Sequence, residues 1–292
     1  MSKVTIEPIK EHVGGIVHVD RAHLCDDDVV EAVRAALEER SVLVFPKINL
    51  SDAEQLAFTD KFGERVKFTS TVPGGEGESD ELYKITLDKK FNPEPDYVLG
   101  TYFWHMDGVT IDQPLPKFTM LSARSLSPTG GQTEFANTFA AYENLPEAEK
   151  EAIKDLKVIH RMEASMRPLY VDMPEERLNR YRTMATVMVH PLVWTHKDGR
   201  KSLVLGTHAD EVVGMSVPDG RALLAQLTEW AAQPAFTYKH EWQQGDFVIW
   251  NNCGAMHRVV PYDADSGRMM HRTTIMGTER LGAPLEAVPE PA

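Results

Sequence analysis

The sequence predicts a mainly β fold with helical insertions, of the β-sandwich or jelly-roll type. Most segments in the middle and at the end of the chain alternate apolar and polar residues as strands do. Helical patterns interrupt them at about 138–155 and 217–232, without the regular β-α alternation of a parallel sheet. Because the 292 residues contain no internal repeat and no low-complexity linker, we expect one domain over 1–292.

The N-terminal part mixes short strands with two helices. Both helices begin with a candidate capping box, formed by Asp28 with Glu31 and by Ser51 with Glu54. Apolar residues recur at helical spacing after the first box, and Gly63 closes the second helix. The expected elements are, in order, strands at 4–9 and 15–19, a helix at 28–40, a strand at 41–45 and a helix at 51–62.

The rest of the chain is expected to consist mostly of strands. Residues 117–122 alternate with period two, and 192–205 form a hairpin turned by Lys197-Asp-Gly-Arg200. A second pair is expected between 236–242 and 247–250, joined through 243–246. The Gly-rich stretch 74–79 is interpreted as a loop, and the Pro-rich tail from Pro284 as a frayed end.

Charge and cysteine content narrow the function classes. The net charge is −13, from 31 Lys and Arg against 44 Asp and Glu, and a field of that sign repels nucleic acid and anionic lipid. The two cysteines, Cys25 and Cys253, lie far apart without a CxxC spacing, which favours a reducing cytoplasm. The start lacks the apolar stretch of a signal peptide, and no run approaches the ~18 apolar residues of a membrane span. The sequence leaves homo-oligomer formation open.

His-x-Asp triplets are the first sign of a metal site. Residues i and i+2 of an extended segment point to one side, so an imidazole and a carboxylate can reach one ion. A second histidine from a distant strand completes a two-His-one-carboxylate face, which leaves three positions for an oxidant and a bidentate co-substrate. Such triplets include His18-Val-Asp20, His105-Met-Asp107 and His208-Ala-Asp210.

Their surroundings separate the three triplets. His105 follows a β-like aromatic run at 101–104, and His257 follows the strand pattern at 247–250. His18 lies in an N-terminal hairpin pattern with no comparable partner and is expected at the surface. His208 lies in a loop-like segment, where it can line a pocket but is a poor candidate for a metal ligand.

Longer motifs follow one another in a characteristic order, and they cover nearly the whole chain. With these motifs the chain resembles the taurine dioxygenase and 2,4-dichlorophenoxyacetate dioxygenase family. One segment departs from it, because the family usually reads Trp-Asp-Asn-Arg where this chain has Trp250-Asn-Asn-Cys253. The matching motifs are Trp104-His-Met-Asp107, Gly130-Gly-Gln-Thr133-Glu-Phe-Ala-Asn-Thr138, His190-Pro-Leu-Val-Trp-Thr-His-Lys-Asp-Gly-Arg200, Gly245-Asp-Phe-Val-Ile-Trp250, Met256-His-Arg258 and Arg268-Met-Met-His-Arg272.

The resemblance implies a distorted double-stranded β-helix and a complete active site. Fe(II) would be bound by His105, Asp107 and His257. 2-Oxoglutarate would chelate the iron through its keto acid end, and its distal carboxylate would pair with Arg268 and Thr133, because arginine offers carboxylates a rigid fork. Arg272 is expected to hold the anionic group of a small organic substrate.

The reaction implied by the resemblance is decarboxylation of 2-oxoglutarate by O₂ to succinate and CO₂, coupled to substrate hydroxylation. A hydroxylated carbon that bears O, N or S would then lose that bond. The presence of Asp107 favours hydroxylation, since related halogenases replace this carboxylate with a small residue. Two other interpretations stay open from the residues alone: a cupin-like metal-dependent isomerase or hydrolase, and a non-catalytic jelly-roll binding protein.

Overall fold

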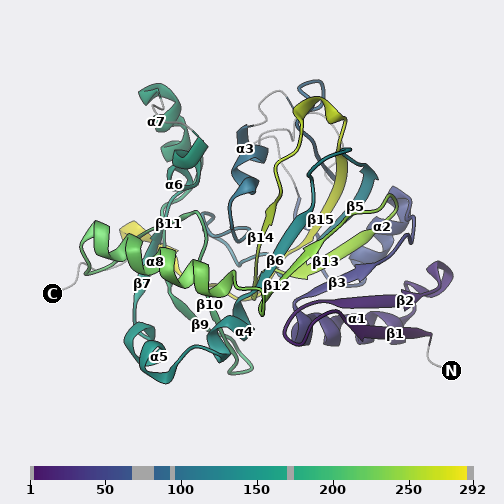
Figure 1. Ribbon diagram of the computed structural model, residues 1–292, viewed down its shortest axis with the longest axis horizontal. Helices are drawn as coiled ribbons and strands as arrows, with labels where there is room; N and C mark the ends of the chain where they lie inside the picture. Colours follow the sequence, from purple (N-terminus) through teal and green to yellow (C-terminus); the bar gives the residue numbers. More distant parts are fainter. Residues whose placement is uncertain (1–2, 68–81, 93–95, 170–173, 288–292) are drawn as a thin grey trace.

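The computed structural model describes residues 3–67, 82–92, 96–169 and 174–287, so the predicted loop at 74–79 lies outside the described residues. A seven-stranded sheet forms one side of the molecule and three smaller sheets face it or extend from it (Figure 1). The mainly β prediction with helical insertions is confirmed. The order of the large sheet is β1 (Val4–Pro8), β2 (Gly15–Val19), β3 (Val42–Phe45), β13 (Phe247–Asn251), β5 (Phe118–Ser125), β15 (Met269–Ile275) and β4 (Tyr83–Ile85).

The smaller sheets carry the second half of the fold. Strand β14 pairs with β6, and β6 in turn with β12, so β6 is the middle strand of the sheet nearest the site. The predicted hairpin at 192–205 is confirmed as β9 and β10. The three sheets are β12 (Thr237–His240), β6 (Thr133–Asn137) and β14 (Ala255–Val259); β11 (Ala209–Val212), β7 (Lys157–His160), β8 (Met188–Pro191) and β16 (Ala283–Pro284); and β9 (Val193–Thr195) with β10 (Lys201–Leu203).

The expected pairing of 236–242 with 247–250 is wrong. Strand β12 pairs with β6, whereas β13 pairs with β3 and β5 in the large sheet. Every residue of β13 is buried, because apolar clusters cover both faces of the large sheet at this central strand, and a separate two-stranded hairpin would leave one face exposed. The tail prediction is also wrong at its start, because Ala283 and Pro284 pair with β8.

Helices cover the outer face of the large sheet and fill the opposite end of the molecule (Figure 1). The capping box of Ser51 and Glu54 is confirmed, but the one expected at Asp28 is wrong, because the helix begins one residue earlier, after Asp26. The helix expected at 138–155 is divided at 144–146. The helices are α1 (Asp27–Arg40), α2 (Asp52–Asp60), α3 (Asp96–Leu99), α4 (Thr138–Glu143), α5 (Glu147–Ile153), α6 (Met162–Met166), α7 (Glu175–Met184) and α8 (Val217–Ala231).

Two apolar layers hold the large sheet in place. On one face, Leu37 of α1 and Phe58 of α2 pack with Phe45, Phe118 and Phe247. On the other face, between the large sheet and β6, the buried cluster is Val13, Val42, Val44, Leu121, Ala123, Phe135, Val248, Trp250, Ala255 and Met270. Phe135 and Trp250 of this inner cluster contact the ring of His257. The candidate site therefore lies between two sheets, at the end of a close-packed core.

Candidate metal centre

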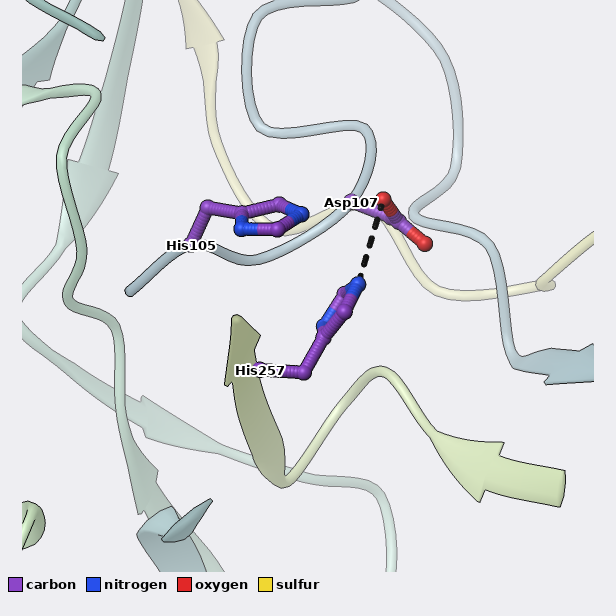
Figure 2. Close-up of side chains that lie close together, drawn as sticks. All are labelled: His105, Asp107 and His257. Carbon is purple, nitrogen blue, oxygen red and sulfur yellow. Dashed lines mark ion pairs between the residues drawn. The ribbon is translucent and has the colours of Figure 1, made fainter. Parts of the chain in front are cut away.

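Three predicted ligands come together between the sheets. The ligand atoms of His105, Asp107 and His257 all lie within 4.8 Å of one another, and both imidazoles are 7% exposed (Figure 2). His257 belongs to β14, and the other two lie in the segment after the 3-10 helix η2 (Gly100–Tyr102). Within the described residues, this is the one group of at least three such side chains that is close enough to share an ion.

A short backbone pairing brings the distant ligands together. His105 N donates to His257 O at 3.0 Å, and His257 N donates back to His105 O at 2.9 Å. Met106 is buried in the neighbouring core, so the residues on either side of it point into the site. The strand expected at 101–104 is wrong, since residues 100–102 form η2 and the extended pairing begins at His105.

Hydrogen bonds assign the metal-facing nitrogen of His105. Its Nδ1 lies 2.9 Å from Phe103 O, and because a carbonyl only accepts, Nδ1 carries the proton and Nε2 presents its lone pair. Gly206 lies against this segment with φ +111°, and a Cβ there would come within 2.9 Å of the His105 Cα. A side chain at this position would displace the first ligand.

Protonation states in the site suit a divalent cation. Burial lowers the pKa of both His105 and His257, which keeps the imidazoles neutral. Burial alone would raise the pKa of Asp107, but the neighbouring guanidinium of Arg272 is the largest of the opposing causes, and that pKa is held at about 2. Metal ligands must be deprotonated, and two neutral imidazoles with one carboxylate form the donor set typical of non-haem Fe(II). The side chains therefore fit the metal that the resemblance implied.

The oxygens of Asp107 have different surroundings. Oδ1 lies 3.8 Å from Nε2 of His257, whereas Oδ2 accepts from Thr119 Oγ1 at 3.1 Å and from Arg272 Nη2 at 2.8 Å. Arg272 also donates from Nε to Thr274 Oγ1 at 3.1 Å. The residue predicted to bind a substrate anion thus lies beside the candidate metal ligands and contacts one of them, Asp107.

The predicted 2-oxoglutarate residues are linked through a tryptophan. Arg268 is 3% exposed, its guanidinium lies 4.7 Å from the Tyr262 ring centre, and no carboxylate of the described chain pairs with it. It lines a cavity of about 220 Å³ together with Gly131 and Trp242, and Trp242 Nε1 donates to Thr133 Oγ1 at 2.9 Å. A buried cation without a countercharge is costly unless a ligand supplies one.

The triplets at His18 and His208 contribute no residue to this cluster. His18 has a 51% exposed side chain, 3.4 Å from Glu7, as expected of a surface residue. Asp210 is turned away from its own histidine and pairs with three arginines, Arg161, Arg167 and Arg221. For His208, burial of the imidazole is the main cause that lowers its pKa to about 3.

Sequence reasoning missed Thr119, Trp242 and Asn252. Thr119 and Trp242 bond to a predicted site residue, and Asn252 bonds to Thr119. Each pair is separated by more than ten residues and joined across strands, so no spacing rule connects the partners.

In the described parts of the chain no helix is long and apolar enough to cross a membrane.

Known proteins resemble this chain over most of its length. The family model described as "Taurine catabolism dioxygenase TauD, TfdA family" matches residues 5–274. The alpha-ketoglutarate-dependent 2,4-dichlorophenoxyacetate dioxygenase of Burkholderia sp. (strain RASC) is 33% identical, covering 85% of this chain and 86% of the relative. An alkylsulfatase of Acinetobacter baylyi is also 33% identical, covering 88% of this chain and 80% of the relative.

Solved structures confirm the double-stranded β-helix fold. A crystal structure of AAD-2 in complex with Mn(II) and N-oxalylglycine has a TM-score of 0.78 and 34% identity, covering 95% of this chain and 99% of that one. A taurine dioxygenase from Burkholderia xenovorans has a TM-score of 0.78 and 25% identity, covering 99% of this chain and 96% of that one. Together with the matched family model and the His-Asp-His geometry, these likenesses show that the chain belongs to the TauD/TfdA family of Fe(II)- and 2-oxoglutarate-dependent dioxygenases.

Proposed function

We propose that this dioxygenase hydroxylates a small organic anion, with His105, Asp107 and His257 as the iron ligands. Arg268 and Thr133 bind the distal carboxylate of 2-oxoglutarate, and Arg272 binds the anionic group of the substrate. The observation that carries the substrate class is the position of Arg272, whose Nη2 lies 2.8 Å from the ligand carboxylate of Asp107. Relatives whose names specify phenoxyacetate, phenoxypropionate and sulfate ester substrates support the same class.

Charge balance supports an anionic substrate. Asp107 brings one negative charge into the site, and a chelating keto acid brings one more through its proximal carboxylate. Fe(II) contributes two positive charges and the guanidinium of Arg272 a third, which exceed the two negative charges of these carboxylates. The buried site therefore keeps a net positive charge that attracts an anion. When bound, the iron couples decarboxylation of 2-oxoglutarate by O₂ to substrate oxidation. The chain itself orients both anions and excludes water.

Thr133 is oriented for the co-substrate. The indole of Trp242 can only donate, so Thr133 Oγ1 accepts that bond and keeps its own proton for another acceptor. A carboxylate that reaches Thr133 and Arg268 together receives a hydroxyl proton and a buried guanidinium.

We infer further that residues 1–292 act as one domain in the cytoplasm, where the free thiols Cys25 and Cys253 stay reduced.

Release of succinate under O₂ tests the proposal. The purified enzyme with Fe(II) and 2-oxoglutarate is screened against aryloxyalkanoates, alkyl sulfates, sulfonates and N-substituted amino acids. Stimulation by members of one anionic class, with loss of the C–O, C–N or C–S bond where the hydroxylated carbon bears the heteroatom, is expected. Stimulation by neutral analogues alone would contradict the substrate class. A metal-dependent reaction without succinate would instead favour an isomerase or hydrolase.

Ligand variants test the metal assignment. His105→Ala, Asp107→Ala and His257→Ala should each abolish succinate release and reduce iron content. His18→Ala is the matched control, because its exposed imidazole pairs with Glu7 far from the site. His208→Ala should also retain iron. Normal iron loading in His257→Ala, or loss of iron in His18→Ala, would refute the ligand set.

A further inference from the structure

A buried chain of hydrogen bonds leads from the β13–β14 turn to the metal ligands. Asn252 lies in this turn and Thr119 on β5, and both side chains are fully buried. Asn252 Nδ2 donates to Thr119 Oγ1 at 2.9 Å, and Thr119 Oγ1 donates to Asp107 Oδ2 at 3.1 Å. The turn is held firmly, because Asn252 N donates to Lys117 O and a Cβ at Gly254 would overlap the Phe139 ring.

The direction of every bond in this chain is determined by chemistry. A metal-binding carboxylate is deprotonated and can only accept, so the single proton of the Thr119 hydroxyl must point to Asp107 Oδ2. Thr119 Oγ1 can then only accept from Asn252, which fixes the orientation of the Asn252 amide. Asn252 Oδ1 is left without a hydrogen-bond partner among the described residues. An apolar side chain of the same shape would remove this unpaired oxygen, so stability alone does not explain the asparagine.

We propose that Asn252 and Thr119 are positioning residues that make Asp107 a ligand through Oδ1 alone. The inference rests on the proposed ligand set. Thr119 and Arg272 both donate to Oδ2, so this oxygen is engaged, and Oδ1 is the atom that faces His257 Nε2. A carboxylate that bound through both oxygens would occupy one of the three open positions that a bidentate keto acid and O₂ require.

Co(II) binding, followed by its visible absorption under anaerobic conditions, tests the relay without catalysis. Thr119→Val removes the hydroxyl but keeps the shape, and we expect Co(II) affinity to fall about 10–100-fold, as is typical when an outer hydrogen bond to a metal ligand is lost. Thr119→Ser should restore it. Thr273→Val is the matched control, because this equally buried hydroxyl on β15 bonds to Thr59 and Gln55 away from the site.

A double-mutant cycle tests whether the two residues act through one contact. Asn252→Leu should weaken Co(II) binding less than Thr119→Val, because the threonine can still donate after losing its partner. The double variant should bind as Thr119→Val does, since the asparagine acts only through the hydroxyl. Additive losses, an unchanged affinity in Thr119→Val, or an equal loss in Thr273→Val would overturn the relay. If Asn252→Leu does not fold, the Thr119 and Thr273 variants decide alone. Failure of the wild-type enzyme to bind Co(II) would refute the metal site itself.

Discussion

At the scale of single residues, the two groups assigned to the distal carboxylate of 2-oxoglutarate should differ in strength. Arg268 is a buried cation, whereas Thr133 offers one neutral hydroxyl. Arg268→Ala removes a charge-assisted contact worth on the order of 2–5 kcal/mol, and Thr133→Val removes one worth about 1 kcal/mol. The half-saturating 2-oxoglutarate concentration for succinate release should therefore rise far more in Arg268→Ala. Equal shifts in the two variants, or none, would show that these residues do not bind the co-substrate.

Arg272 and Arg268 should bind different anions. Arg272→Leu keeps bulk but removes the charge, so substrate-stimulated succinate release should collapse while slow release without substrate continues. Iron binding should persist, because removal of a cation beside the metal site offsets the loss of its hydrogen bond to Asp107 Oδ2. Arg268→Leu is the comparison and should impair both activities through the co-substrate. Loss of iron or of folding in Arg272→Leu would indicate that Arg272 mainly supports Asp107.

At the scale of elements, the turn that departs from the family pattern has its own partners. Asn251 Nδ2 donates to Glu38 Oε2 at 3.0 Å, and Lys117 Nζ lies 2.8 Å from Glu38 Oε1. The usual aspartate would place a second carboxylate against Glu38. Asn251→Asp should therefore lower the free energy of unfolding by on the order of 1 kcal/mol, because the bond is lost and half-exposed Glu38 is partly screened.

A compensating change checks the cause. Glu38→Gln restores a donor opposite an aspartate, so the double variant Asn251→Asp with Glu38→Gln should recover most of the stability lost in urea unfolding. If Glu38→Gln alone raised the free energy of unfolding of the otherwise unchanged protein by the same amount, the gain would be a general effect of removing the Glu38 charge. Cys253 in the same turn is a buried filler, and burial raises the pKa of its thiol to about 12. Alkylation of this thiol should therefore require unfolding.

Local chemistry explains which elements the sequence predicts well. The hairpin turned at Gly199, with φ +85°, and the helix capped by Ser51 follow from a few adjacent residues. The partners of β12 and β13 depend instead on which sheet buries each strand, and the period-two pattern carries no such information. The cluster of His105, Asp107 and His257 was predictable because motifs mark its members. Thr119, Trp242 and Asn252 were not, because their roles arise from contacts between strands.

At the scale of the whole molecule, buried histidines make the fold sensitive to acid. Burial lowers the folded-state pKa of several imidazoles below the ordinary 6.5, so the unfolded chain binds more protons than the folded one as pH falls. The contribution of these groups to stability is complete above about pH 6.5 and declines below it, toward their folded pKa values. The histidines concerned are His105, His160, His190, His196, His208, His257 and His271, with values of about 4 for His196 and about 3 for His208.

His160 offers the clearest test of this acid sensitivity. Its ring is fully buried beside His190, and neither nitrogen has a hydrogen-bond partner within the described chain, so burial holds its pKa well below 6.5. The free energy of unfolding of the metal-free protein, measured in urea, should fall between pH 7.5 and pH 5. His160→Leu should reduce this fall by about 2 kcal/mol, because the variant lacks the one proton that the unfolded chain takes up at a pKa near 6.5. His18→Gln, at an exposed position, is the variant with which His160→Leu is compared. If His160→Leu retains the full pH dependence, His160 takes up its proton in the folded state, and the acid sensitivity must come from the other buried imidazoles.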